Sequence, residues 1–224
     1  MLAGLQRRLV DLYDLRLGVE VEDFVCDEQT ARSLGGEEAA RRGEVLFVVE
    51  RADGAEVALW IEPGARSQRG DGWLGSPGRF RRACLAAEGV SHFVFVAFRA
   101  DHALETSELE LELQAEIDKW ALGLLAPWRG LEHASLLAGR GTELVRLRDR
   151  SQRLRERLFS GASFLDAAGT ERGERYREAS RLAERYALQM ERAHVLRGDL
   201  PELGRELRRF YRVGLREKIE RIGG

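Results

Sequence analysis

"EGVSHFVFVAFRADHALETSELELELQAEIDKW", residues 88–120, joins an apolar run to a segment dense in carboxylates. In the apolar run, residues 92–98, hydrophobic side chains follow one another instead of alternating with polar ones. A strand that is buried on both faces has this pattern. We therefore predict a strand at residues 92–98, reached through a turn at Gly89 and covered by helices on both sides.

Two further apolar runs, residues 45–49 and 57–61, predict a hairpin earlier in the chain. The sequence between them contains Asp53-Gly54, the dipeptide favoured at the centre of a two-residue type I′ turn. Counted from this turn, the cross-strand pairs are Arg51 with Glu56, Val49 with Ala58 and Phe47 with Trp60. An ion pair and an aromatic pair would then lie across the ladder.

The segment after the predicted third strand is typical of a helix between two layers. At 100° per residue, residues 104–125 form two apolar stripes on roughly opposite sides. Between the stripes lies a row of glutamates that ends in a lysine: Glu105, Glu108, Glu112, Glu116 and Lys119. Like charges at this spacing repel each other. We therefore expect the row to face basic residues, for which an arginine strip on the last helix is the candidate.

Most of the remaining chain predicts helices. Leucines recur at helical spacing over residues 2–12, residues 78–89 suit a helix between the second and third strands, and residues 19–27 suit a short strand or an extended connection. From residue 104 the pattern is helical to the end, with breaks at residues 127–130, 139–143, 160–173 and 197–201. The last helix starts near Pro201, with Asp199 as its N-cap.

That last helix has two contrasting sides. Its apolar stripe contains Leu203, Leu207, Phe210, Tyr211, Leu215, Ile219 and Ile222. Its basic strip contains Arg205, Arg209, Arg212 and Arg216. An apolar stripe of this kind indicates packing between antiparallel helices or a dimer interface, rather than a cofactor pocket.

These elements predict an α+β fold. It consists of a small, mainly antiparallel sheet of three or four strands flanked by helices, followed by a C-terminal bundle of long helices. We expect residues 1–126 to form the sheet-containing domain. Residues 127–224 would form a helical region that packs on it or mediates self-association.

Charge is distributed unevenly along the chain. Residues 1–139 contain 15 Lys and Arg against 24 Asp and Glu, a net charge of −9, whereas residues 140–224 contain 21 against 14, a net charge of +7. A basic half can indicate nucleic-acid binding, but the interspersed acids neutralise much of its field. A self-paired, solvated surface is the favoured interpretation.

Composition also predicts a cytoplasmic protein that does not enter a membrane. Only two cysteines, Cys26 and Cys84, are present, too few for a disulfide framework. The first residues are typical of an amphipathic helix and not of a signal peptide. No uninterrupted apolar run approaches the ~20 residues that a membrane span needs.

Candidates for a metal or acid-base site lie around the predicted third strand: Glu88, His92, Asp101, His102 and Glu105. Imidazole and carboxylate groups bind metal ions and transfer protons. In an extended run, however, His92 and Asp101 would lie roughly 25–30 Å apart, at about 3.3 Å per residue. We therefore interpret His92 as the first residue of a strand and predict no catalytic residue, metal or cofactor. The common phosphate-loop, dinucleotide, zinc-protease and nucleophile-elbow motifs are also missing from the sequence.

A long glycine-rich loop, residues 63–78, suggests a partner-binding segment. Its aromatic and apolar pair, Trp73 and Leu74, is flanked by Arg66, Arg69 and Arg79. Such a combination suits an acidic patch on a protein partner. The alternative is that Trp73 packs into the core and the loop is only a connection.

Together these observations predict a non-catalytic cytoplasmic interaction or regulatory protein. It would self-associate through its C-terminal helices and bind an unidentified protein partner. One alternative is an arginine-rich nucleic-acid-binding protein that uses the basic strip of the last helix. A second alternative is an uncommon metal-dependent enzyme that uses Glu88, His92 and His102.

Overall fold

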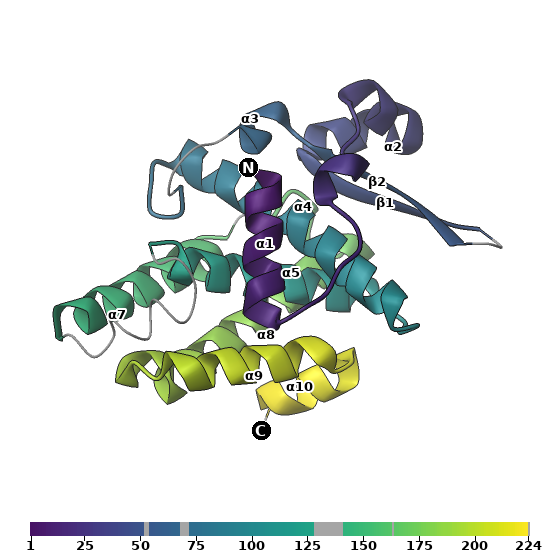
Figure 1. Ribbon diagram of the computed structural model, residues 1–224. Helices are drawn as coiled ribbons and strands as arrows, with labels where there is room; N and C mark the ends of the chain where they lie inside the picture. Colours follow the sequence, from purple (N-terminus) through teal and green to yellow (C-terminus); the bar gives the residue numbers. More distant parts are fainter. Residues whose placement is uncertain (52–53, 68–71, 128–140, 163, 224) are drawn as a thin grey trace.

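Helices α4 (Pro77–Asp101) and α5 (Glu108–Leu125) pack against each other at the centre of the fold (Figure 1). The computed structural model describes residues 1–51, 54–67, 72–127, 141–162 and 164–223. Helix α1 (Leu2–Tyr13) contacts α4, and α8 (Glu171–Ala193) contacts α5. One cluster of buried apolar side chains runs through these elements, from Leu2 to Ile222. The core is therefore built by helices from both ends of the chain.

Helix α4 takes the place of the predicted third strand, so that prediction was wrong. Residues 92–98 lie in the second half of the helix, and Gly89, the expected turn, lies within it. The run is buried on nearly all sides, so it lacks the polar face that would reveal a helical period. A consecutive apolar run fits a buried helix as well as a buried strand. Pro77 in the first turn fixes where the helix begins.

The predicted hairpin is confirmed, but its register differs. Strands β1 (Glu44–Arg51) and β2 (Gly54–Ile61) pair antiparallel, with Arg51 opposite Gly54, Val49 opposite Glu56 and Phe47 opposite Ala58. Gly54 has a φ of 153°, which glycine adopts readily, and it pairs as a strand residue instead of lying at the turn centre. Asp53 lies outside the described residues. Because the shift is two residues, each side chain stays on its predicted face.

The sheet in the described part of the chain has these two strands, not three or four. Residues 19–27 contain a 3₁₀ turn, η1 (Val21–Phe24), and an isolated parallel bridge from Val25 to Leu59. Helix α2 (Glu28–Arg42) follows. Asp27 caps it by accepting a hydrogen bond from the Thr30 amide at 2.8 Å, and Gly36 kinks it with a φ of 71°.

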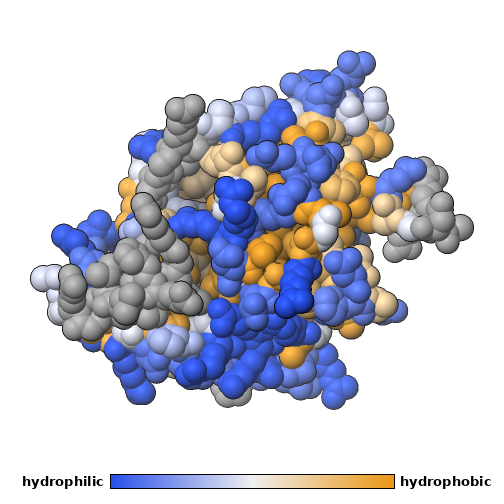
Figure 2. All heavy atoms as spheres, in the orientation of Figure 1, coloured by the Kyte–Doolittle hydropathy of each residue, from blue (hydrophilic) through white to orange (hydrophobic). Residues whose placement is uncertain are grey.

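The C-terminal region is helical, as predicted. It contains α7 (Gly141–Arg155), the π-turn η2 (Glu156–Ser160), α8, the 3₁₀ turn η3 (Val195–Arg197), α9 (Leu200–Arg212) and α10 (Leu215–Gly223). The predicted last helix is thus two helices, which extended backbone at Val213 separates. Asp199 caps α9 as predicted and accepts from the Glu202 amide at 3.2 Å. The side of the molecule that carries α9 is mostly hydrophilic in Figure 2, because the apolar stripe points inward.

Helix α4 has a second property that follows from its apolar composition. Among the described helices it alone is long and apolar enough to cross a membrane. In the folded chain 67% of its most apolar window is buried. A core helix has this combination of properties, and the cytoplasmic location of the protein stays a prediction.

Candidate metal and acid-base site

Five acidic and imidazole side chains converge where α4, α5 and β1 meet. Glu88 and His92 lie one turn apart on α4, and Glu112 and Glu116 lie one turn apart on α5, so each pair shares a helix face. Glu44 begins β1. We call these five residues, together with Lys119, the central cluster.

Short polar contacts connect the members of the central cluster. The two ring nitrogens of His92 approach different carboxylates: Nδ1 lies 3.3 Å from Glu44 Oε1 and Nε2 lies 3.5 Å from Glu112 Oε2. Lys119 Nζ donates to Glu88 Oε2 at 3.1 Å and to Glu116 Oε1 at 2.7 Å. His92 is only 4% exposed, yet its Nε2 makes no hydrogen bond in the described structure.

The geometry around His92 Nε2 suits a metal ion. Ligand atoms of Glu88, His92 and Glu112 all lie within 4.8 Å of one another. Two ligands bound at about 2.1 Å to one ion stand roughly 3.0–3.4 Å apart when they subtend 90–110°. The 3.5 Å between Nε2 and Glu112 Oε2 is close to this value. One imidazole and two carboxylates form a donor set for Mn²⁺, Fe²⁺ or Zn²⁺.

The central cluster contains more acid than base. Burial raises the pKa of Glu44 and of Glu116. For His92, burial is the largest single influence and opposes the charge, but Glu44 and Glu112 outweigh it and hold the pKa well above its ordinary value. Four carboxylates therefore face Lys119 and His92. A divalent ion bound at Nε2 would displace the ring proton there and add net positive charge to this buried arrangement.

Two cavities open onto opposite parts of the central cluster. The larger, of about 690 Å³, is lined by Glu88, Glu116 and Lys119. The smaller, of about 360 Å³, is lined by His92 and Glu112. Glu44 lines both. An ion held by Glu88, His92 and Glu112 could therefore be approached from either cavity.

Tyr176, on α8, adds a phenol to both cavities. Its pKa is raised by burial first, and then by the charges of Glu112, Glu88 and Glu44. The phenol is therefore neutral at ordinary pH and close to the carboxylates. A neutral phenol can donate a proton or a hydrogen bond to a bound molecule.

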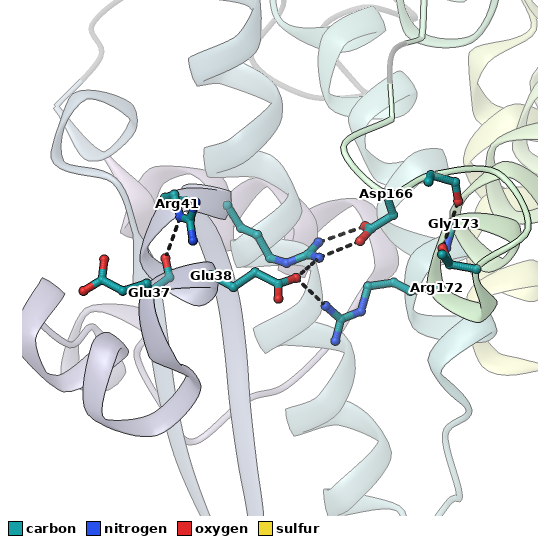
Figure 3. A network of polar contacts seen from close by, with 9 residues as sticks. Glu37, Glu38, Arg41, Asp166, Arg172 and Gly173 are labelled. Carbon is teal, nitrogen blue, oxygen red and sulfur yellow. Dashed lines mark hydrogen bonds and ion pairs between the residues drawn. The ribbon is translucent and has the colours of Figure 1, made fainter.

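An ion-pair network joins the elements around the two cavities. Arg42, at the end of α2, lines both cavities and pairs with Asp166 at 2.7 Å and with Glu38 at 2.6 Å. Arg172, on α8, pairs with Glu38 at 3.3 Å. Figure 3 shows Arg172 reaching Glu38 from the opposite side, with Asp166 on the same side as Arg172. The network therefore ties α2 to the segment that leads into α8.

The structure brings together only some of the predicted site residues. Glu88 and His92 belong to the central cluster, whereas Asp101, His102 and Glu105 are exposed at the far end of α4 and in the loop after it. Sequence reasoning missed Glu44 and assigned Glu112 and Glu116 to a row that faces the arginine strip of the last helix. The available signal was that both Glu88 and His92 on α4 and Glu112 and Glu116 on α5 are four residues apart. This spacing is informative only when residues 88–98 are assigned to a helix.

The predicted partner of the glutamate row was also wrong. Lys119, His92 and Arg175 of α8 neutralise the row, with Arg175 pairing with Glu108. The basic strip of the C-terminal helices has other partners. Pairs within a helix join Arg205 to Glu202, Arg209 to Glu206 and Arg216 to Glu220, and Arg212 donates to the carbonyls of Tyr13 and Asp14 at the end of α1. These arginines are therefore engaged away from the glutamate row.

The proposed partner-binding loop is partly core. Trp73 is 4% exposed and lies against Gly123 of α5, so it packs inside as in the alternative interpretation. Leu74 is half-buried against the same core, and Arg66 lies over the Trp60 ring at 5.6 Å. Arg79 is exposed on the first turn of α4, and Arg69 lies outside the described residues.

Comparisons with known protein families, with curated proteins and with solved structures find no match for this chain.

Proposed function

We propose that this protein is a metal-dependent enzyme that binds a divalent first-row transition metal ion through Glu88, His92 and Glu112. The observation that supports this proposal is the convergence of one ligand atom each from Glu88, His92 and Glu112 within 4.8 Å of one another, and the buried His92 Nε2, 3.5 Å from Glu112 Oε2, has no hydrogen bond in the described structure. Catalytic metal sites typically have three protein ligands and an open position, whereas structural sites are closed. Here the open position would face the two cavities.

The bound ion would act as a Lewis acid or lower the pKa of a bound water molecule. Glu44 is placed to orient the His92 ring, because it lies 3.3 Å from Nδ1, the nitrogen that does not face the proposed metal. Lys119 holds Glu88 and Glu116 in position. Tyr176 would supply a proton at the wall that the two cavities share.

Isothermal titration of the metal-free protein with Mn²⁺ and Zn²⁺ tests the proposal. We expect one site per chain, and a loss of affinity of at least about tenfold in His92→Ala and in Glu112→Gln, because even outer-shell changes cost 10–100-fold. His102→Ala and Glu105→Gln are matched controls, since both residues are exposed and outside the central cluster. Wild-type protein that binds neither ion, or binding that survives His92→Ala, would refute the site.

A second candidate function, binding of a nucleic-acid backbone, is supported by arginines outside the predicted strip. Arg185, Arg192 and Arg197 surround a shallow surface depression at the end of α8. Their guanidinium groups make no ion pair or hydrogen bond within the described parts of the chain, unlike Arg205 and Arg209. Unpaired cations are the ones that can neutralise phosphates and release counterions.

Duplex binding measured over a salt series distinguishes the two sets of arginines. We expect Arg192→Glu combined with Arg197→Glu to weaken binding and reduce its salt dependence. Arg205→Glu combined with Arg209→Glu should have a smaller effect. Absence of binding at low ionic strength would exclude this candidate function.

A further inference from the structure

The larger cavity combines an apolar wall with four arginines, of which Arg42 and Arg81 pair with carboxylates, whereas Arg41 and Arg157 have no carboxylate partner among the described residues. Phe80, Leu85, Leu158 and Phe164 line it, and its inner end reaches Glu88 and Glu116 of the central cluster. A volume of about 690 Å³ lies within the range of small-molecule sites. The apolar wall favours an organic molecule over an inorganic ion.

Arg157 is the main cation in this cavity. Its Nη1 donates to the carbonyl oxygens of Trp73 at 3.2 Å and Gly75 at 2.9 Å, and its guanidinium lies 4.4 Å from the centre of the Phe80 ring. Carbonyl groups orient the guanidinium without neutralising it. The Nε and Nη2 donors have no acceptor in the described residues, so one edge of the fork is available to a ligand.

A second arginine without a carboxylate partner among the described residues also lines the cavity. This arginine, Arg41, is exposed, and its described hydrogen bond is to a backbone carbonyl, that of Glu37, at 3.3 Å. Arg157 lines the same cavity as Glu88 and Glu116, so one small molecule can contact both the arginine and the central cluster.

From this arrangement we infer that the larger cavity binds a small organic anion, a carboxylate or phosphate ester with an apolar body. Arg157 holds its anionic group, and the apolar wall holds its body. The inference deepens the proposed function and rests on it only in treating this anion as the substrate of the metal site. Preorganised arginine forks bind carboxylate and phosphate groups in a bidentate manner.

Titration calorimetry with phenyl phosphate tests the inference, with benzyl alcohol as the uncharged probe and inorganic phosphate as the probe without an apolar body. We expect phenyl phosphate to bind more tightly than either. Arg157→Gln should weaken binding of phenyl phosphate by about tenfold or more, and Arg157→Lys by less, because it keeps the charge but loses the fork. Arg153→Gln removes an exposed arginine that pairs with Asp149 one turn away, and it should have no effect.

The assays are run on both metal-free and Mn²⁺-loaded protein, with Mn²⁺ affinity and far-ultraviolet circular dichroism measured for every variant. Phenyl phosphate binding that depends on Arg157 supports the cavity even where Mn²⁺ does not bind, and in that case only the metal proposal fails. Mn²⁺ binding without phenyl phosphate binding overturns the cavity inference alone. Equal phenyl phosphate affinity in wild type and Arg157→Gln also overturns it. If Arg157→Gln does not fold, Arg41→Gln tests the cavity instead, because Arg41 is exposed. We then expect the affinity for phenyl phosphate to fall at least about twofold, and an unchanged affinity would overturn the inference.

Discussion

Lys218 is one of only two lysines in the chain, and its side chain is fully buried. Its Nζ donates to Gln114 Oε1 at 3.1 Å, pairs with Glu110 Oε1 at 3.3 Å and lies 4.5 Å from the centre of the Phe95 ring. Burial lowers its pKa to about 8. This lysine belongs to a second buried polar group on another face of α5, separate from the central cluster.

The lowered pKa predicts that stability rises with pH in a defined window. In the unfolded chain a lysine has a pKa of about 10.4, so between about pH 8 and 10 the unfolded state binds more protons than the folded state. The free energy of unfolding therefore increases as pH rises through this range. Relative to Lys218→Met, wild type should gain about 1 kcal/mol between about pH 7.5 and 9.

Urea unfolding at several pH values measures this gain. Cys84 acts in the opposite direction above about pH 9, since its pKa is raised, but it is present in both proteins and cancels in the difference. Arg216→Met, which removes an exposed charge from the same helix, should keep the pH dependence of wild type. A constant difference between wild type and Lys218→Met would show that Lys218 does not titrate in this window.

The residues of the central cluster show how far sequence reasoning reaches at this scale. Glu88 and His92 are recognisable as reactive types, and Glu112 and Glu116 as a row, because these properties are local. Whether a carboxylate points to water or to an imidazole depends on the neighbouring helix, which the sequence does not place. Glu44 is the clearest example: it lies 48 residues before His92, yet the two side chains are in contact.

At the scale of elements, α4 decides the position of the site. It places Glu88 and His92 against α5 and also presses against the hairpin at Gly89. A Cβ added there would lie 2.7 Å from Ile61 Cδ1 and 3.0 Å from Glu44 Cγ. Read as a strand, the same residues would have left Glu88 in a turn and Asp101 far from His92.

Gly89→Ala should therefore destabilise the protein and disturb the central cluster. Overpacking costs about 1–3 kcal/mol, whereas the better helix propensity of alanine returns up to about 1 kcal/mol. We expect a net loss of about 1–2 kcal/mol in urea unfolding and weaker Mn²⁺ binding, because Glu44 must move. Gly78→Ala is the matched control in the same helix, since its added Cβ would meet nothing within 4 Å. Unchanged stability in Gly89→Ala would mean that α4 and the hairpin do not approach this closely.

At the scale of the whole molecule, ion pairs join the acidic and basic halves at α8 and the segment before it. Arg42 with Asp166 and Arg172 with Glu38 cross from one half to the other. The uneven charge along the sequence predicts a self-paired surface, but it does not identify the pairs: the arginine comes from the basic half in the pair of Arg172 with Glu38 and from the acidic half in the pair of Arg42 with Asp166. The net charge of a segment does not specify which of its residues come into contact, whereas an ion pair depends on which helix packs on α5.

The sequence also could not assign a role to the apolar stripe of α9 and α10, and self-association through it stays a proposal. The periodicity identified the apolar face, but it could not decide between an internal core and a dimer interface. In the folded chain Phe210 is 1% exposed, and its ring lies 4.1 Å from that of Tyr186. Ile219, further along the same predicted stripe, is 41% exposed.

The difference in exposure between Phe210 and Ile219 provides a test of whether the stripe mediates self-association. Phe210→Asp would bury a carboxylate in an apolar site, so we expect a loss of at least about 3 kcal/mol of folding free energy whatever the oligomeric state. Ile219→Asp should leave urea unfolding of the monomer unchanged. If wild type self-associates through these helices, light scattering should show that Ile219→Asp lowers the assembly mass while the chain stays folded. An assembly that persists in Ile219→Asp would place the contact on another surface, because the buried part of the stripe is already occupied by the protein's own core.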